Sequence, residues 1–217
     1  MSVNNAKLNN AVTVYISTFD SNVVVREVEP AIRNEMIQRC TDTLTKLQHY
    51  CVWQLLDYAL RVCYGKGVKD CDLYVDGNGK WRCRNGVYFS LAHSNNVVAV
   101  ALCNQEVGVD VELTSKFVSH ANDNKFANRV LTDSEQEMLL NVSAQRRAKA
   151  LAEIWTKKES VFKLQGGNSF TPKNIDTAKI ATHSQFLTIN GEQYALSVAT
   201  NVDGSVSIST VDEIFVN

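Results

Sequence analysis

The chain has 217 residues, of which 45% are apolar and 21% are charged. This composition is typical of a folded globular protein and excludes disordered, collagen-like and low-complexity classes. The 22 Lys and Arg residues nearly balance the 23 Asp and Glu residues, which excludes a nucleic-acid binder driven by overall positive charge. No apolar run approaches the ~18 residues of a membrane span, and the N-terminal MSVNNAKLNN lacks the features of a signal peptide. We therefore expect a cytoplasmic protein with no membrane or nucleic-acid partner.

The first half of the chain predicts a strand, two helices and two hairpins. Residues 12–19 alternate in polarity and are rich in β-branched types, which indicates a strand. From Pro30 to Tyr64 apolar residues recur at steps of three and four, which predicts two helices that meet near residues 41–43. Turn sequences at Asp76–Gly79 and Ser94–Asn96 predict hairpins, the first between DLYV and KWRC and the second between VYFSLAH and VVAVALC.

The second half predicts one strand, two helices and three further strands. VGVDVEL at 107–113 is typical of a strand. A helix is expected to begin after Thr132 or Asp133, and a longer one covers about Ala144–Gln165 and ends at two glycines. The remaining strands are FLTI and YALSVAT, which flank an Asn190–Gly191 turn, and SVSISTV near the end of the chain.

Each half thus combines helices with hairpins, and no Pro-rich or Ser-rich linker separates them. This layout predicts an α+β fold of two closely packed halves, residues 1–105 and 106–217. No internal sequence repeat supports the division.

Two carboxylates share one face of the strand at 107–113. A period of two sends Gly108, Asp110 and Glu112 to the same side. Their backbones lie roughly 7 Å apart, so the side chains can converge on one hard cation, and Gly108 leaves room for a ligand. A strand with a merely solvated acidic face gives the same pattern, so the motif alone leaves both interpretations open.

The helix at 144–165 places a carboxylate where a hydrophobic residue is expected. At about 100° per residue, Glu159 falls within the apolar stripe that contains Leu151, Ile154, Trp155 and Phe162. An unpaired buried carboxylate is costly, so Glu159 requires a cation. The candidates are Lys163, one turn later, or a metal ion held jointly with Asp110 and Glu112; an ordinary surface Glu–Lys pair is the alternative.

Basic residues near these carboxylates suggest a bound polyanion, as in phosphoryl-transfer sites, although a solvated lysine face gives the same composition. His93 ends a strand before a turn, where it could reach a phosphate or serve only the turn. Lys80 and Lys46 are weaker candidates for phosphate contacts. No P-loop, dinucleotide-binding or serine-hydrolase motif is present. The basic residues are Arg146, Arg147, Lys149, Lys157, Lys158, Lys163 and Lys173.

Three sequence blocks, in this order and spacing, resemble the 4′-phosphopantetheinyl transferase family, in its larger single-chain type that activates surfactin synthetase. FSLAHS at 89–94 is similar to the family's F-N-x-S-H-S, and VGVDVE at 107–112 to its G-[IV]-D-[IV]-E. IWTKKESVFKLQG at 154–166 is similar to W-x-x-K-E-[AS]-x-x-K-x-x-G, and FANRVLTDSEQEML at 126–139 resembles R-x-[FL]-[ST]-x-x-E less closely. The resemblance covers residues 76–167, and the combination is specific although no single block is.

The resemblance implies a Mg²⁺ site, with Mn²⁺ as a substitute, formed by Asp110, Glu112 and Glu159 on the pyrophosphate of the co-substrate coenzyme A. Lys163 would stabilise charge on the phosphate or the leaving group, and Lys158 would lie beside it. His93 would contact the 3′-phosphoadenosine end of coenzyme A. Lys80 and Lys46 would be further phosphate partners.

The implied reaction is attack by a serine hydroxyl of an apo acyl or peptidyl carrier protein on the β-phosphate of coenzyme A, with release of 3′,5′-ADP. Glu159 is our candidate for the base that activates the serine. The alternatives are an inactive module that binds coenzyme A or a carrier protein, and a Mg²⁺-dependent phosphohydrolase built on the same carboxylates.

The resemblance also implies a fold of two similar α+β halves, packed as a pseudo-two-fold pair with the site at their seam. Because one chain then forms the whole cleft, we expect a monomer. The carrier protein is expected to dock on exposed apolar and basic residues near the second-half helices.

Two departures from the family pattern occur in the FSLAHS block. Ser90 replaces a frequent Asn, and Ala92 replaces a Ser that commonly contacts the ligand. One lost hydrogen bond is worth roughly 0.5–1.5 kcal/mol, which predicts weaker coenzyme A binding rather than inactivity. The segment LQGGNSFTPK also lacks the family's usual G-x-G-L order.

Overall fold

The computed structural model describes residues 11–212 and 214–215, which form two compact units. The first unit takes in the chain up to Val107 and from Asn201 onward, and the second runs from Gly108 to Thr200. The N-terminal MSVNNAKLNN, on which the signal-peptide argument rests, lies outside the described residues. Within the described ranges, none of the helices has the length and apolarity needed to cross a membrane.

The first unit contains a four-stranded sheet in the order β4-β5-β1-β9. β1 (Val12–Thr18) pairs antiparallel with β5 (Val97–Cys103), which pairs antiparallel with β4 (Tyr88–Ser94). On its other side β1 pairs in parallel with β9 (Val206–Thr210). A separate two-stranded sheet consists of β2 (Leu73–Val75) and β3 (Trp81–Cys83), and a short helical turn, η2 (Val68–Asp70), precedes it.

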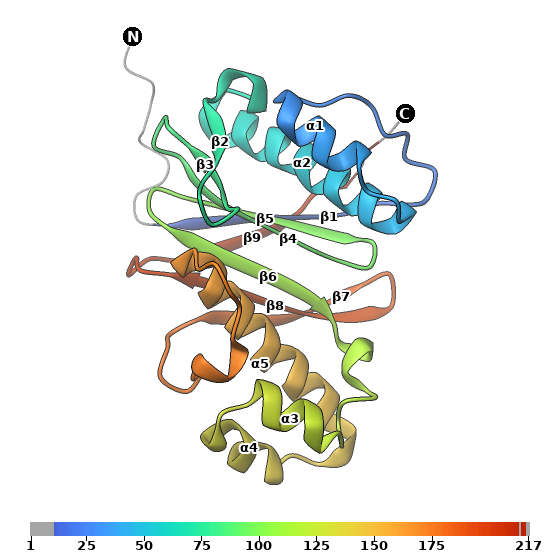
Figure 1. Cartoon of the computed structure of the whole chain (residues 1–217), viewed down its shortest axis with the longest axis vertical. Helices are drawn as coiled ribbons and strands as arrows, with labels where there is room; N and C mark the ends of the chain where they lie inside the picture. Colours follow the sequence, from blue (N-terminus) through green and yellow to red (C-terminus); the bar gives the residue numbers. More distant parts are fainter. Residues whose placement is uncertain (1–10, 213, 216–217) are drawn as a thin grey trace. The chain divides into compact units, whose positions relative to one another are not determined.

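Two helices, α1 (Ala31–Gln38) and α2 (Thr43–Tyr64), cover one face of this sheet (Figure 1). α2 begins where the Asp42 side chain accepts a hydrogen bond from Thr45 N at 2.7 Å. It ends at Gly65, whose φ of 70° is a left-handed conformation that suits glycine. The apolar face of α2 forms the centre of the core, with Cys51, Trp53, Leu55, Leu56, Ala59 and Leu60 fully buried.

The second unit contains a three-stranded sheet in the order β6-β8-β7. Its strands are β6 (Val107–Leu113), β7 (His183–Ile189) and β8 (Glu192–Thr200). The long helix α5 (Ala144–Gln165) packs along β8 (Figure 1). Shorter helices complete the unit: η3 (Thr114–Phe117), α3 (Asn124–Val130), α4 (Asp133–Leu140) and η4 (Pro172–Asn174).

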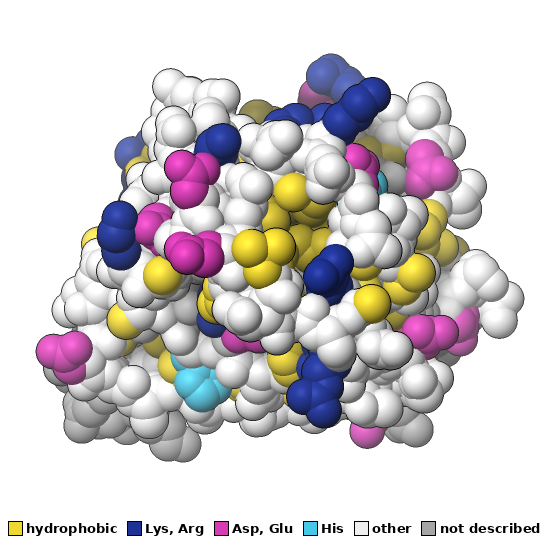
Figure 2. Space-filling model, turned by 90° about the horizontal axis from the view of Figure 1, so that it is seen from below, with side chains coloured by type: hydrophobic (Ala, Val, Ile, Leu, Met, Phe, Trp, Pro, Cys, Tyr) yellow, Lys and Arg dark blue, Asp and Glu magenta, His cyan; other side chains and the backbone are white. Residues whose placement is uncertain are grey.

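An apolar cluster joins α3, α4 and the first half of α5, and it includes Phe126, Leu139 and Leu151. On α4 the side chains of Met138 and Leu140 remain exposed. Figure 2 views the molecule from the side on which Figure 1 shows α3 and α4, and hydrophobic side chains are visible there between charged ones.

The α+β class predicted from the sequence is confirmed, and the predicted strands and long helices are found within a few residues of their expected ends. The last strand differs in placement. The expected C-terminal half was 106–217, whereas β9 pairs with β1 in the first unit. An alternating pattern indicates a strand but does not specify its neighbour. The predicted pairing of two similar halves, with a site at their seam, stays a prediction.

Candidate functional site

β6 and α5 approach each other closely because β6 carries a glycine. A Cβ atom on Gly108 would lie 1.8 Å from Ser160 O and 2.6 Å from Leu164 N. No side chain fits at such distances, so the position requires glycine. The expectation that Gly108 leaves room for a ligand is therefore wrong, because the backbone of α5 fills that room. The same close packing brings the carboxylate of β6 within reach of the last turns of α5.

Asp110 on β6 and Lys163 on α5 form an ion pair. Lys163 Nζ lies 2.7 Å from Asp110 Oδ1 and donates a second hydrogen bond to Val109 O at 3.1 Å. Asp110 is only 5% exposed, and its other oxygen, Oδ2, is buried with no hydrogen-bond partner among the described residues. A buried acceptor without a partner costs about 1–3 kcal/mol. Oδ2 is therefore an acceptor available to an incoming cation or donor.

Two further carboxylates act on this pair. Burial raises the pKa of Asp110 to about 7; Lys163 opposes the rise, and the negative charges of Glu159 and Glu112 add to it. Burial also raises the pKa of the half-buried Glu159, again opposed by Lys163 and reinforced by Glu112. Glu112 itself pairs with Lys116 at 2.9 Å. Three mutually repelling carboxylates thus lie near Lys163 in the second unit.

The chemistry of these residues fits a hard divalent cation, although the side chains as they stand do not form a finished metal centre. Carboxylate oxygens are the ligands that Mg²⁺ prefers, and the unpartnered Oδ2 of Asp110 is one such oxygen. Within residues 11–212 and 214–215, however, no group of three or more His, Cys, Asp and Glu side chains is arranged to hold a metal ion. Lysines contact two of the three carboxylates instead. The metal site therefore stays a prediction.

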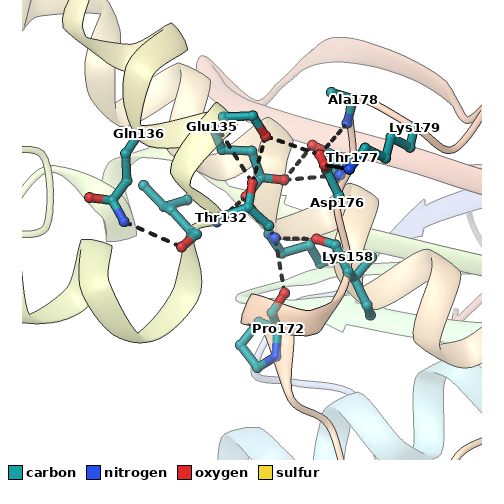
Figure 3. A network of polar contacts seen from close by, with 12 residues as sticks. Thr132, Glu135, Gln136, Lys158, Pro172, Asp176, Thr177, Ala178 and Lys179 are labelled. Atoms are coloured by element: carbon teal, nitrogen blue, oxygen red, sulfur yellow. Dashed lines mark hydrogen bonds and ion pairs between the residues drawn. The ribbon is translucent and has the colours of Figure 1, made fainter.

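Lys158 differs from its expected place beside Lys163. Its side chain is fully buried, with Nζ 2.7 Å from Glu135 Oε2 (Figure 3). The ammonium also donates to Pro172 O at 2.9 Å and to Ile175 O. These three acceptors match the three N–H donors of a lysine. Lys158 therefore fastens the 172–175 segment to α5 and has no donor left for coenzyme A.

Glu135, the partner of Lys158, is the Glu of the R-x-[FL]-[ST]-x-x-E segment, but the sequence interpretation gave it no role. Thr132 caps α4 and exchanges hydrogen bonds with Glu135 in a capping box. Thr177 donates two more hydrogen bonds to Glu135, from its backbone N at 3.0 Å and its hydroxyl at 2.7 Å (Figure 3). The T-x-x-E spacing before an apolar run was the available signal for this contact. It predicted the helix start but not the buried lysine.

Comparison with known proteins connects this unit to a family. Residues 106–211, which include the Asp110–Lys163 pair, match the family model described as the 4′-phosphopantetheinyl transferase superfamily. The matched segment is just under half of the chain. The resemblance seen in the sequence is thereby confirmed for that part of the chain.

Individual relatives in the superfamily match at modest identity. The chain is 31% identical over 94 residues to the 4′-phosphopantetheinyl transferase AcpT of Salmonella typhi, covering 42% of this chain and 46% of the relative. It is 30% identical over 88 residues to the 4′-phosphopantetheinyl transferase gsp of Aneurinibacillus migulanus, covering 41% and 35%. For the 4′-phosphopantetheinyl transferase psf-1 of Bacillus pumilus the identity is 26% over 133 residues, covering 60% and 55%. The matches span between about a third and about half of these relatives' lengths.

Three residues that the superfamily resemblance implied as coenzyme A contacts lie in the first unit. Lys80 pairs with Glu106 at 2.8 Å, and Lys46 Nζ donates to Gln38 Oε1 at 2.9 Å. His93, near the end of β4, places its ring 5.4 Å from the ring of His49 on α2. Both lysine amines thus already have acceptors inside their own unit, and the roles of all three residues stay predictions.

Proposed function

We propose that this protein transfers the 4′-phosphopantetheine arm of coenzyme A to a serine of an apo acyl or peptidyl carrier protein. The observation that carries the proposal is the contact of Asp110 with Lys163, with Glu159 and Glu112 nearby, inside the segment that matches the superfamily. Carboxylates that repel one another beside a lysine suit a site for a pyrophosphate and its cation.

Asp110, Glu112 and Glu159 would hold Mg²⁺, or Mn²⁺ in its place. The bound ion would neutralise negative charge on the pyrophosphate oxygens. The unpartnered oxygen of Asp110 and the all-oxygen donor set support this assignment.

Glu159 is proposed as the base that accepts the proton of the carrier serine. Burial raises the pKa of its carboxyl group, which makes its carboxylate a stronger base. The serine oxygen forms a bond to the β-phosphorus of coenzyme A, and the bond from that phosphorus to the oxygen of the departing 3′,5′-ADP breaks. The serine proton moves to Glu159, and the ADP carries away the electron pair of the broken bond.

Lys163 is proposed to stabilise the charge on the departing phosphate. Its ammonium is directed by Asp110 Oδ1 and Val109 O, which limits its freedom before substrate binds. His93, Lys80 and Lys46 are proposed to contact the phosphoadenosine end of coenzyme A. Activity as a monomer in the cytoplasm belongs to the same proposal.

A mass measurement tests the function. The full chain is incubated with coenzyme A, Mg²⁺ and a panel of apo carrier proteins, and each carrier is weighed. A gain of one phosphopantetheine mass is expected. Release of 3′,5′-ADP without a modified carrier would instead identify a phosphohydrolase, and neither product would identify a binding module.

Glu159→Gln tests the assigned base. The variant should lose transfer by roughly 10²–10⁴-fold, while coenzyme A binding changes far less. Glu153→Gln is the matched control, because Glu153 lies on the same helix but pairs with Lys157 at 2.8 Å. An active Glu159→Gln enzyme would remove Glu159 from this role.

A further inference from the structure

Two cysteines of the first unit lie in contact at one end of the β2–β3 hairpin. Cys71 and Cys83 are free and half-buried, and their thiols are hydrogen-bonded to each other. Cys83 is the last residue of β3, and Cys71 lies two residues before the start of β2. Neither thiol takes part in the proposed transfer of phosphopantetheine.

The pairing of the two strands explains why the thiols meet. Leu73 pairs with Cys83 in the antiparallel register, so Cys71, two residues before Leu73, falls on the same face of the hairpin as Cys83. Leu73 N donates to Cys71 O at 3.0 Å, a tight turn that folds the chain just before β2. Arg84 N donates to Asp72 O at 3.0 Å and continues the contact between the two segments. The backbone therefore holds the two thiols side by side, as a disulfide requires.

The pair lies between the apolar core and a cavity. Both side chains pack against the core of the first unit. Burial, and then the neighbouring Cys83, raise the pKa of the Cys71 thiol to about 11, so this thiol is slow to react with a reagent from solution. Cys83 lines a cavity of about 460 Å³ beside β3 and β4. A small oxidant can therefore reach Cys83 first, and Cys71 then lies within reach of the Cys83 sulfur.

We propose that Cys71 and Cys83 form a reversible disulfide that locks the β2–β3 hairpin, with a small-molecule disulfide such as oxidised glutathione as the oxidant. The Cys83 thiolate attacks one sulfur of the oxidant, which forms a mixed disulfide and expels one glutathione thiolate. The Cys71 thiolate then attacks the Cys83 sulfur, which forms the bond between the two cysteines and expels the second glutathione thiolate. Two electrons pass from the protein to the oxidant, and the two protons of the cysteines go to the two glutathione thiolates. Excess reduced glutathione reverses both steps.

The bond would stabilise a part of the chain that has little support of its own. β2 and β3 have three residues each and form a separate two-stranded sheet, and a hairpin of two strands is marginally stable at best. A disulfide closes residues 72–82 into a loop, which restricts the open hairpin and so favours the closed one. The redox state of the pair would thus set how easily the hairpin opens. This inference goes beyond the proposed function and does not depend on it.

The first experiment maps the bond in the full-length wild type. The protein is equilibrated with glutathione buffers that range from fully reduced to fully oxidised, the remaining thiols are blocked with N-ethylmaleimide, and the digested peptides are weighed. Cys71 and Cys83 should appear as one cross-linked pair, at a smaller share of oxidised glutathione than any other cysteine needs in order to react. Unlinked Cys71 and Cys83 in every buffer, or a bond from either to another cysteine, would overturn the proposal.

Two variants test the order of the steps. Cys71→Ser lacks the second thiol, so Cys83 should remain as a mixed disulfide, seen as a gain of one glutathione. Cys83→Ser should take up no glutathione at Cys71, because burial protects that thiol. Cys40→Ser is the matched control, because Cys40 is another half-buried cysteine of the same unit, and the bond should form as in the wild type. A glutathione adduct on Cys71 in Cys83→Ser would overturn the assigned order of attack.

Hydrogen exchange measures the lock itself. The amides of residues 72–82 should exchange severalfold more slowly in the oxidised wild type than in the reduced one, and the fast exchange should return on reduction. Cys71→Ser, treated with the same buffers, should show no such difference. A cross-linked hairpin that exchanges as fast as the reduced hairpin would overturn the switch. Each of these measurements gives its answer even if the chain transfers nothing to any carrier.

Discussion

Two of the lysines on α5 lie five residues apart, and each forms an ion pair of the same length with a carboxylate. Lys158 pairs with Glu135 at 2.7 Å, and Lys163 pairs with Asp110 at 2.7 Å. Both carboxylates are buried, but they differ in how their oxygens are satisfied. Both oxygens of Glu135 accept hydrogen bonds, from Thr132, Thr177 and Lys158. Asp110 leaves Oδ2 unpartnered.

Their acidities move in opposite directions. Burial alone would raise the pKa of Glu135, but the hydrogen bonds from Lys158, Thr132 and Thr177 outweigh it and lower the pKa. At Asp110 burial prevails and the pKa rises to about 7. Two ion pairs of the same length can therefore leave their carboxylates with opposite pKa shifts. The difference comes from how far the remaining lone pairs are satisfied and from the neighbouring charges.

The largest expected effect comes from removing each lysine in turn. Lys158→Met leaves Glu135 as a buried carboxylate without its cation, which should cost about 3–5 kcal/mol of unfolding free energy. Lys163→Met should cost much less at pH 7, because Asp110 can take up a proton near that pH. Urea unfolding of both variants measures the difference. Equal losses of unfolding free energy would show that Glu135 and Asp110 depend on their lysines to the same degree.

A second prediction concerns the close approach that creates the Asp110–Lys163 pair. Gly108→Ala places a methyl group against the backbone of α5, and such overpacking costs about 1–3 kcal/mol or more. Gly77→Ala is the control, because nothing lies within 4 Å of its added methyl. Thermal unfolding compares the two variants. A Gly108→Ala protein as stable as the control would mean that β6 and α5 do not touch in this way.

The smallest effect is the response of the Glu135 pair to acid. The folded pKa of Glu135 lies below the unfolded value of about 4.3. The contribution of Glu135 to the free energy of unfolding is therefore complete at a pH above the unfolded pKa, and it is lost as the pH falls through the folded pKa. The stability difference between the wild type and Glu135→Gln should stay constant from pH 7 to about pH 5 and then shrink.

Glu192→Gln, at an exposed glutamate of the same unit, provides the control for this titration. The difference in unfolding free energy between Glu192→Gln and the wild type should stay small over the whole pH range. A Glu135→Gln difference that grows on acidification would contradict the assignment of Glu135 as an ionised, well-bonded carboxylate.

Local patterns in the sequence predicted most elements of this fold. Alternation located β6, and steps of three and four located α2 and α5, because burial of one face imposes those periods. The same reasoning offered Lys163 as a cation for Glu159 and grouped Asp110 with Glu159 around a metal ion, whereas the structure places Lys163 in contact with Asp110. α3 was missed, since its seven residues lie in a polar stretch that carries little periodicity.

What the sequence did not reveal depends on contacts between distant segments. Lys158 is one of several lysines on α5, and the helical pattern around it does not show that it is buried, whereas Lys157 pairs with Glu153 on the helix. Its burial follows from carbonyl groups at 172 and 175, which only the folded chain brings to it. Gly108 was interpreted as leaving space for a ligand. A glycine in a strand indicates that another group approaches the backbone closely, but it does not identify that group.

The parallel pairing of β1 with β9 has a consequence for how the chain folds as it is made. The first unit is discontinuous, since Gly108–Thr200 separates its two segments. Until the ribosome has released β9, β1 has an open edge that could pair with another nascent chain. Gly108–Thr200 has no such dependence and can complete its own sheet first. Shortening the chain before Val206 should therefore damage the unit that is synthesised first.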